Sequence, residues 1–135
     1  GTDINSTTFA VGGRAGNGAY TNSSGEGYVA YMFVDIEGYS KFGQYIGNGV
    51  ADGTFIYTGF RPAWVMIKNF EASGSWHIID NKRIGYNERN DVLIADITAV
   101  EQTNYTVQER DLLSNGFKMR DGNSGTNASG GTYIY

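Results

Sequence analysis

The sequence contains two copies of one short segment, and their spacing constrains the size of the unit that the chain can fold into. Residues 21–29 read TNSSGEGYV and residues 126–134 read TNASGGTYI. Every pair of matching positions, Tyr28 and Tyr133 among them, is 105 residues apart. A period of this length is too long for a solenoid unit and matches a small domain.

A second, weaker match lies upstream of each copy and supports the same period. Residues 8–11 (TFAV) correspond to residues 116–119 (GFKM), with a join to the next segment that differs in length, as surface loops do. We therefore expect residues 28–135 to form one repeat domain. Residues 1–27 are expected to be the closing segment of a preceding repeat or an N-terminal extension.

The distribution of glycines and apolar residues predicts an all-β fold. The chain has 20 Gly and one Pro, and Gly supplies the positive φ angles of tight turns. Short apolar or alternating runs lie between these turns, which is typical of a β-sandwich. We expect a two-sheet antiparallel β-sandwich of jelly-roll or lectin-like topology. Its expected strands are 28–34, 40–46, 54–58, 63–68, 76–80, 105–113, 117–120 and 132–135.

Three local patterns refine this expectation. Residues 63–68 are apolar on both faces, which is typical of a strand in the middle of a sandwich, so Trp64 is expected in the core. Asn115-Gly116 between two apolar runs indicates a hairpin. Residues 91–101 combine helical spacing with many β-branched residues, so a short helix and an irregular loop both remain open there.

The composition argues against several functional classes. Cysteine is absent and His77 is the single histidine, so neither a catalytic triad nor a zinc site finds enough partners. The net charge of −4 does not favour a nucleic-acid partner. The sequence contains no run of 18 apolar residues, so it predicts no membrane span. Residues 121–127 faintly resemble a calcium loop, but Asx turns explain them better. We expect no enzyme, no metal and no cofactor.

Exposed aromatic side chains are the best candidates for ligand binding, because their apolar faces can stack on sugar rings. Trp76, which follows the expected hairpin loop Ser73-Gly74-Ser75, is the candidate ligand-binding residue, because Trp64 is better explained as a core residue. Tyr86 and Tyr105, in expected loops, are weaker candidates.

Several segments together resemble a known family. Residues 38–49 (GYSKFGQYIGNG), 59–68 (GFRPAWVMIK), 113–118 (LSNGFK) and 126–135 (TNASGGTYIY) are similar to a domain found in virion proteins of marine tailed phages. The resemblance covers about residues 28–135 and is weakest at 86–109. It implies a virion location and tandem repetition in long, fibre-like proteins, and it carries no catalytic residues.

These observations lead to one functional expectation and one alternative. We expect a structural repeat of a phage tail fibre or virion appendage that displays loops to host-surface glycans. Its expected partners are other copies of itself, by analogy as a trimer, and neighbouring virion proteins. The alternative is a capsid decoration or neck protein without receptor binding.

Overall fold

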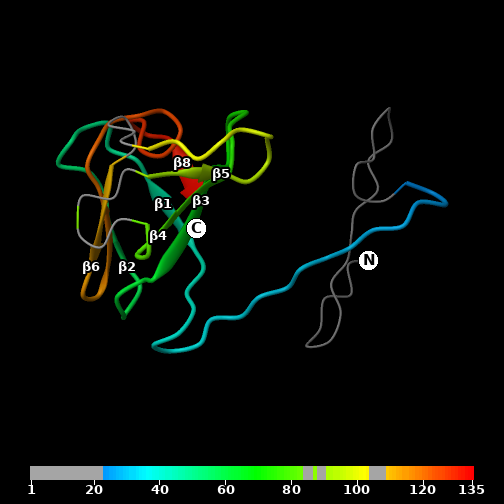
Figure 1. The fold of residues 1–135 in the computed structure, drawn as a ribbon, viewed down its shortest axis with the longest axis horizontal. Coiled ribbons are helices and arrows are strands. Elements are labelled where there is room, and N and C mark those ends of the chain that lie inside the picture. Colours follow the sequence, from blue (N-terminus) through cyan, green and yellow to red (C-terminus); the bar gives the residue numbers. More distant parts are fainter. Residues whose placement is uncertain (1–22, 84–86, 88–90, 104–108) are drawn as a thin grey trace. The chain divides into compact units, whose positions relative to one another are not determined.

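The protein is all-β in the part of the chain that the computed structural model describes, which is residues 23–83, 87, 91–103 and 109–135 (Figure 1). The chain divides into two compact units, Gly1–Phe33 and Val34–Tyr135. The described residues of the second unit contain eight strands and no helix. The strands are β1 (Gln44–Ile46), β2 (Phe55–Tyr57), β3 (Trp64–Asn69), β4 (His77–Asp80), β5 (Leu93–Ile94), β6 (Arg110–Leu113), β7 (Gly116–Met119) and β8 (Thr132–Ile134).

The strands form two antiparallel sheets, which confirms the predicted all-β class with two sheets. The five-stranded sheet has the order β1-β8-β3-β4-β5, and the three-stranded sheet has the order β2-β7-β6. β8 is the last strand in the chain, yet it lies between β1 and β3. Its Tyr133 is opposite Tyr45 on one side and Asn69 on the other.

Side chains from both sheets meet in one hydrophobic core. Strands alternate between buried and exposed residues, as expected for sheets with one face covered. The rings of Tyr45 and Tyr133 stack with centroids 5.1 Å apart, and Phe117 of the other sheet meets Tyr45 edge-on at 6.4 Å. The core residues are Tyr45, Ile56, Val65, Ile67, Ile79, Val92, Leu112, Phe117, Met119 and Tyr133.

The predicted hairpin at Asn115-Gly116 is confirmed, with its turn one residue earlier than expected. Leu113 pairs with Gly116, so the two-residue loop is Ser114-Asn115. Gly116 belongs to β7, where a Cβ atom would lie 2.1 Å from the carbonyl oxygen of Ile56. The glycine is therefore required by the close approach of β2 to β7 and not by the turn.

Two other local predictions need correction or completion. The sequence predicts a buried strand at residues 28–34, but these residues form none and are exposed (Figure 1). An apolar β-prone run becomes a strand only when another strand forms hydrogen bonds with its backbone, and none of the strands in the described residues pairs with this run.

The structure also decides between the two alternatives for residues 91–101. They form a loop and not a helix, with the short strand β5 and a bridge from Val92 to Gln102.

The repeated sequence segment has a repeated local structure. The N–H of Ser23 donates to the Tyr28 hydroxyl at 2.9 Å, and the N–H of Ala128 donates to the Tyr133 hydroxyl at 2.8 Å. The third residue of each turn is a glycine with positive φ, 83° at Gly25 and 77° at Gly130. The fourth residue donates its N–H to the carbonyl of the first, at 3.3 Å in residues 23–26 and 3.1 Å in residues 128–131. These are the features of type II turns, and they occur 105 positions apart.

Candidate binding face

The outer face of the five-stranded sheet, opposite the core, is rich in apolar residues. The cross-strand register brings Met66 of β3, Ile78 of β4 and Leu93 of β5 into one row. These side chains are partly exposed, while their neighbours Ile67 and Ile79 are buried in the core. We call this surface the outer face and define it by Trp64, Met66, Lys68, Trp76, Ile78, Asp80 and Leu93.

Both tryptophans belong to the outer face. Trp64 is opposite Asp80 in the β3–β4 ladder, and Trp76 lies one position before β4. Since side chains alternate along a strand, Trp76 points to the same face as Ile78, as its contact with Lys68 also indicates. Lys68 lies four positions after Trp64 in β3, which corresponds to about 13 Å along the strand.

The expectation that Trp64 is in the core is wrong. Its side chain is 54% exposed, although β3 is the central strand of its sheet. A doubly apolar strand predicts cover on both faces, and the described residues supply cover on one face only. Trp64 is therefore the more accessible of the two tryptophans.

Trp76, the residue singled out from the sequence, is half-buried beneath a lysine. The Lys68 ammonium lies 5.6 Å from the centroid of its ring, a cation–π arrangement. The backbone N–H of Trp76 donates to Asp96 Oδ1 at 3.0 Å, and this hydrogen bond is the main reason why the pKa of Asp96 is lowered. Trp76 is thus held in place by its neighbours, whereas Trp64 offers an open ring. The other aromatic candidates, Tyr86 and Tyr105, lie outside the described residues.

The outer face presents aromatic, apolar and charged side chains to a ligand or to another protein. An exposed indole ring stacks on apolar faces such as those of sugar rings, and the neighbouring Lys68 and Asp80 can hydrogen-bond to hydroxyl groups. Asp80 is itself paired with Arg83, Oδ2 to Nη2 at 2.9 Å, and Arg83 also contacts Glu101. This chemistry suits recognition of polar molecules with apolar faces.

Several ionisable side chains lie in or beside the core. Burial lowers the pKa of Arg110 to about 10, against the opposing attraction of Asp121, whose own pKa is raised by burial. Burial and the charge of Arg110 lower the pKa of His77 to about 4, so its imidazole is neutral at neutral pH. The Tyr45 hydroxyl donates to the carbonyl of Thr126 at 2.6 Å. The structure therefore places His77 in the interior, as a structural histidine.

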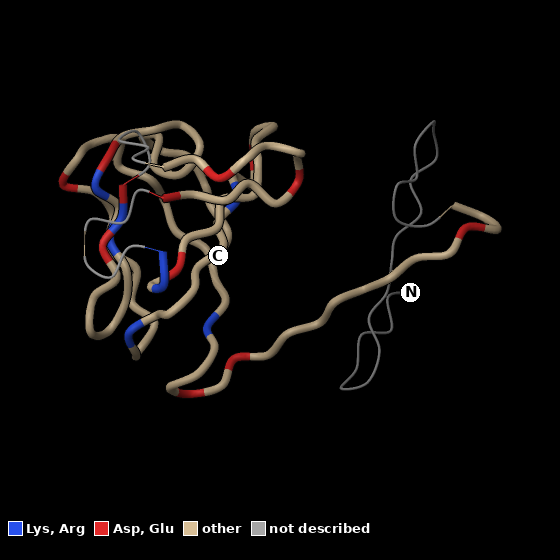
Figure 2. The backbone as a smooth tube through the Cα atoms, viewed as in Figure 1, with Lys and Arg blue, Asp and Glu red and all other residues tan. Residues whose placement is uncertain are grey.

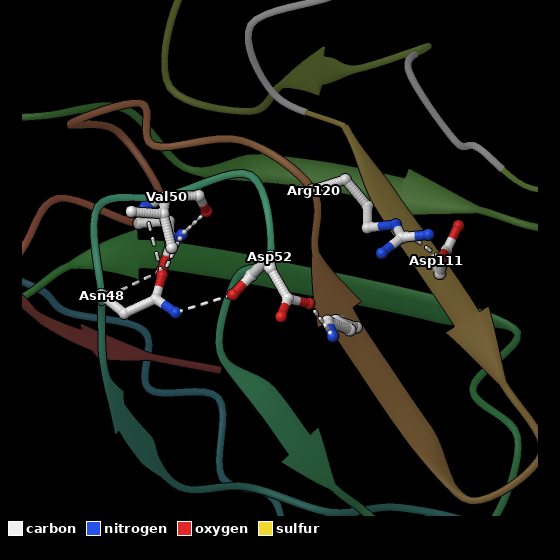
Figure 3. A network of polar contacts seen from close by, with 7 residues as sticks. Asn48, Val50, Asp52, Asp111 and Arg120 are labelled. Atoms are coloured by element: carbon white, nitrogen blue, oxygen red, sulfur yellow. Dashed lines mark hydrogen bonds and ion pairs between the residues drawn. The ribbon is translucent and has the colours of Figure 1, made fainter.

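A second polar network fixes the loop between β1 and β2 (Figure 3). Asn127 is fully buried, and its amide donates to Asn48 Oδ1, the Val50 carbonyl and the Asp121 carbonyl at 3.0, 3.2 and 2.6 Å. Lys118 pairs with Asp52 of the same loop. Sequence reasoning missed Asn127, because its Asn- and Gly-rich surroundings indicated only a turn; its recurrence as Asn22 was the available signal.

The segment that faintly resembles a calcium loop consists of consecutive Asx turns. Asp121 Oδ1 accepts the N–H of Asn123 at 2.6 Å, and Asn123 Oδ1 accepts the N–H of Gly125 at 2.8 Å. These side-chain oxygens thus stabilise the local backbone. Within the described ranges, no three His, Asp or Glu side chains are grouped so that they could hold a metal ion.

No helix in the described part of the chain is long and apolar enough to cross a membrane.

The fold and the outer face define an all-β domain of two antiparallel sheets with an exposed aromatic surface. The chain belongs to the family described as Domain of unknown function (DUF7483), whose model matches residues 1–135. Searches of curated proteins and of solved structures returned no match.

Proposed function

We propose that this chain is a structural repeat of a phage tail fibre or a related virion appendage, located on the outside of the virion. The observation that carries the proposal is the pair of identical turns at residues 23–28 and 128–133, each closed by the same backbone-to-tyrosine hydrogen bond. A chain that repeats a turn at the period of a small domain is built as an array. The resemblance of residues 38–49, 59–68, 113–118 and 126–135 to virion proteins of tailed phages supports the virion setting.

The proposed role of the domain is to display weak binding surfaces in many copies. The outer face supplies an exposed indole at Trp64, which suits a host-surface glycan. Repeats along one chain, and association with further copies of that chain, turn weak single contacts into avidity. By analogy with fibres of this type, the assembly is a trimer that contacts neighbouring virion proteins.

Binding to bacteria tests this proposal. The biotinylated chain is displayed on streptavidin and applied to intact marine bacteria and to a glycan array, beside Trp64→Ala, Trp76→Ala and Tyr57→Ala. Tyr57 is the matched control, because it is a 64% exposed aromatic on the other sheet. We expect saturable binding that Trp64→Ala abolishes and Tyr57→Ala retains. Equal binding by all folded variants, or none by the parent, contradicts glycan recognition at this face.

One observation favours the alternative of a capsid decoration or neck protein without receptor binding. The row of Met66, Ile78 and Leu93 makes the outer face apolar, and a surface of this kind suits burial against a neighbouring protein. This alternative predicts that Trp64→Ala weakens self-association or incorporation into virions while glycan binding is absent from parent and variant alike. Analytical ultracentrifugation of the same variants separates the two functions.

A further inference from the structure

The segment that precedes the compact unit Val34–Tyr135 is apolar, uncharged and exposed. Residues 27–34 contain no charged side chain between Glu26 and Asp35 (Figure 2). Their large side chains range from 50% exposed at Tyr28 to 83% exposed at Tyr31. Exposed contiguous apolar surface of this kind marks an interaction site in a folded protein.

The start of this segment has the same local structure as the segment that leads into β8. The turn with a positive-φ glycine and the backbone bond to the tyrosine hydroxyl occur in both, as described above. In the second copy the chain continues directly into β8, where Tyr133 is fully buried between β1 and β3. The first copy thus has the same turn and the same tyrosine hydrogen bond that lead into β8 in the second copy.

The sequence differences between the copies fit the same interpretation. Tyr133, which points into the core, is kept as Tyr28. Within β8 the differences fall on its two neighbours, Thr132 to Gly27 and Ile134 to Val29, whose positions lie on the partly exposed face of the strand. A change of size is tolerated there and would not be tolerated at a core position.

We propose that residues 27–29 form the strand that corresponds to β8, between β1 and β3, in the five-stranded sheet of a preceding copy of this domain, with Tyr28 in the position of Tyr133. The proposal rests on the repeat organisation described under Proposed function. Consecutive domains are then joined by the apolar residues 30–33, which lead directly from the closing strand of one domain to Val34 of the next. The partner of this segment is therefore a second copy of the domain.

A chimera tests whether the first copy can act as β8. Residues 128–134 are replaced by residues 23–29, which amounts to four substitutions: Ala128→Ser, Gly131→Glu, Thr132→Gly and Ile134→Val. A matched control carries the same four changes and also exchanges the tyrosine with a serine, through Ser129→Tyr and Tyr133→Ser. We expect the chimera to unfold cooperatively within about 15 °C of the parent, and the control to lose cooperative unfolding. Equal loss in both proteins would overturn the proposal.

A tandem protein provides a second test that does not depend on these substitutions. Residues 34–115 are placed directly before Thr8 of the chain, because Thr8 corresponds to Gly116 in the repeat. If the proposal is correct, hydrogen exchange at the amides of residues 27–29 becomes at least ~100-fold slower than in the single chain. Unchanged exchange overturns it. So does concentration-dependent protection in the single chain, which would assign the segment to an interface between identical chains.

Neither the unfolding of the chimera nor the hydrogen exchange of the tandem protein depends on bacterial binding. Lack of glycan recognition would contradict the proposed function and leave the exchange result intact. Fast exchange in the tandem protein would exclude the strand assignment even if the displayed chain binds bacteria.

Discussion

Asn127 and Asn48 exchange two hydrogen bonds through the side chain of Asn127. Its Oδ1 accepts the N–H of Asn48, and its Nδ2 donates to Asn48 Oδ1, both at 3.0 Å. The same amide donates to two carbonyl groups of neighbouring loops. This fully buried amide joins the β1–β2 loop, which contains Asn48 and Val50, to the β7–β8 loop, which contains Asp121 and Asn127 itself. It stabilises both loops, because each partner would otherwise be left without its hydrogen bond.

Replacing this amide is therefore expected to destabilise the domain strongly. Asn127→Ala removes the donor for the Val50 and Asp121 carbonyls, which should lower the free energy of unfolding by about 2–4 kcal/mol. Urea denaturation followed by tryptophan fluorescence measures the change. Ser129→Ala, at an exposed position two residues away, serves as control and should change stability by less than about 0.5 kcal/mol. Similar losses in both variants would contradict the role of the Asn127 amide.

The interior position of His77 predicts how stability depends on pH. Its folded-state pKa of about 4 is below the ordinary value of 6.5, so the unfolded chain binds the proton more readily. The contribution of neutral His77 is fully present above pH 6.5 and is lost as the pH falls from 6.5 towards 4. Urea midpoints measured between about pH 4 and 7 should fall more steeply for the parent than for His77→Gln.

The comparison with His77→Gln isolates this effect from other groups. Burial raises the pKa of Asp121, so its contribution has the opposite sign and is present equally in parent and variant. The pKa values of Asp35, Asp52 and Asp96 are lowered from the ordinary value of 3.8. Their contributions to the free energy of unfolding therefore change mainly below pH 3.8. Parallel pH profiles for parent and variant would show that His77 does not titrate with folding.

The close contact of β2 with β7 predicts that Gly116 tolerates no side chain. Gly116→Ala would place Cβ 2.1 Å from the Ile56 carbonyl oxygen, which must separate the two strands and lower the free energy of unfolding by at least about 2 kcal/mol. Gly74→Ala is the matched control, since its Cβ meets nothing closer than 3.9 Å. Thermal unfolding followed by circular dichroism distinguishes them, and a tolerated Gly116→Ala would refute the packing of this hairpin.

The two repeated tyrosines should respond differently to loss of their hydroxyl groups. Tyr133→Phe removes the acceptor for the Ala128 N–H and the donor to the Ser124 carbonyl, which should lower the free energy of unfolding by about 1–3 kcal/mol. Tyr28→Phe should leave the unfolding midpoint of the single chain unchanged, because Tyr28 is half-exposed and lies outside the compact unit Val34–Tyr135. In the tandem protein both changes should destabilise a domain. Calorimetry resolves the two transitions.

Elements with strong local signals could be predicted from the sequence. The alternation around Ile56, the apolar run at 63–68 and the Asn115-Gly116 hairpin all lie within or next to observed strands. These patterns depend on residues that are close in the sequence, so they can be recognised without knowledge of the tertiary structure.

The predictions that failed depended on contacts between residues that are far apart in the sequence. Trp64 and Val65 are both apolar, and only the second layer decides which of them is buried. Residues 28–34 have the composition of a strand, but the sheet that would receive them is not supplied by the described residues. The buried role of Asn127 depends on Asn48, which is 79 residues away, so no local pattern indicates it.

The place of β8 between β1 and β3 determines when a newly synthesised domain can become complete. β1 and β3 have no shared ladder in this sheet; each pairs with β8, which is the last of these strands to be translated. While the ribosome still holds residues 132–135, the two halves of the sheet stay unjoined and their edges remain open to wrong partners. In the proposed array, each domain would therefore complete its five-stranded sheet only as its final strand leaves the exit tunnel.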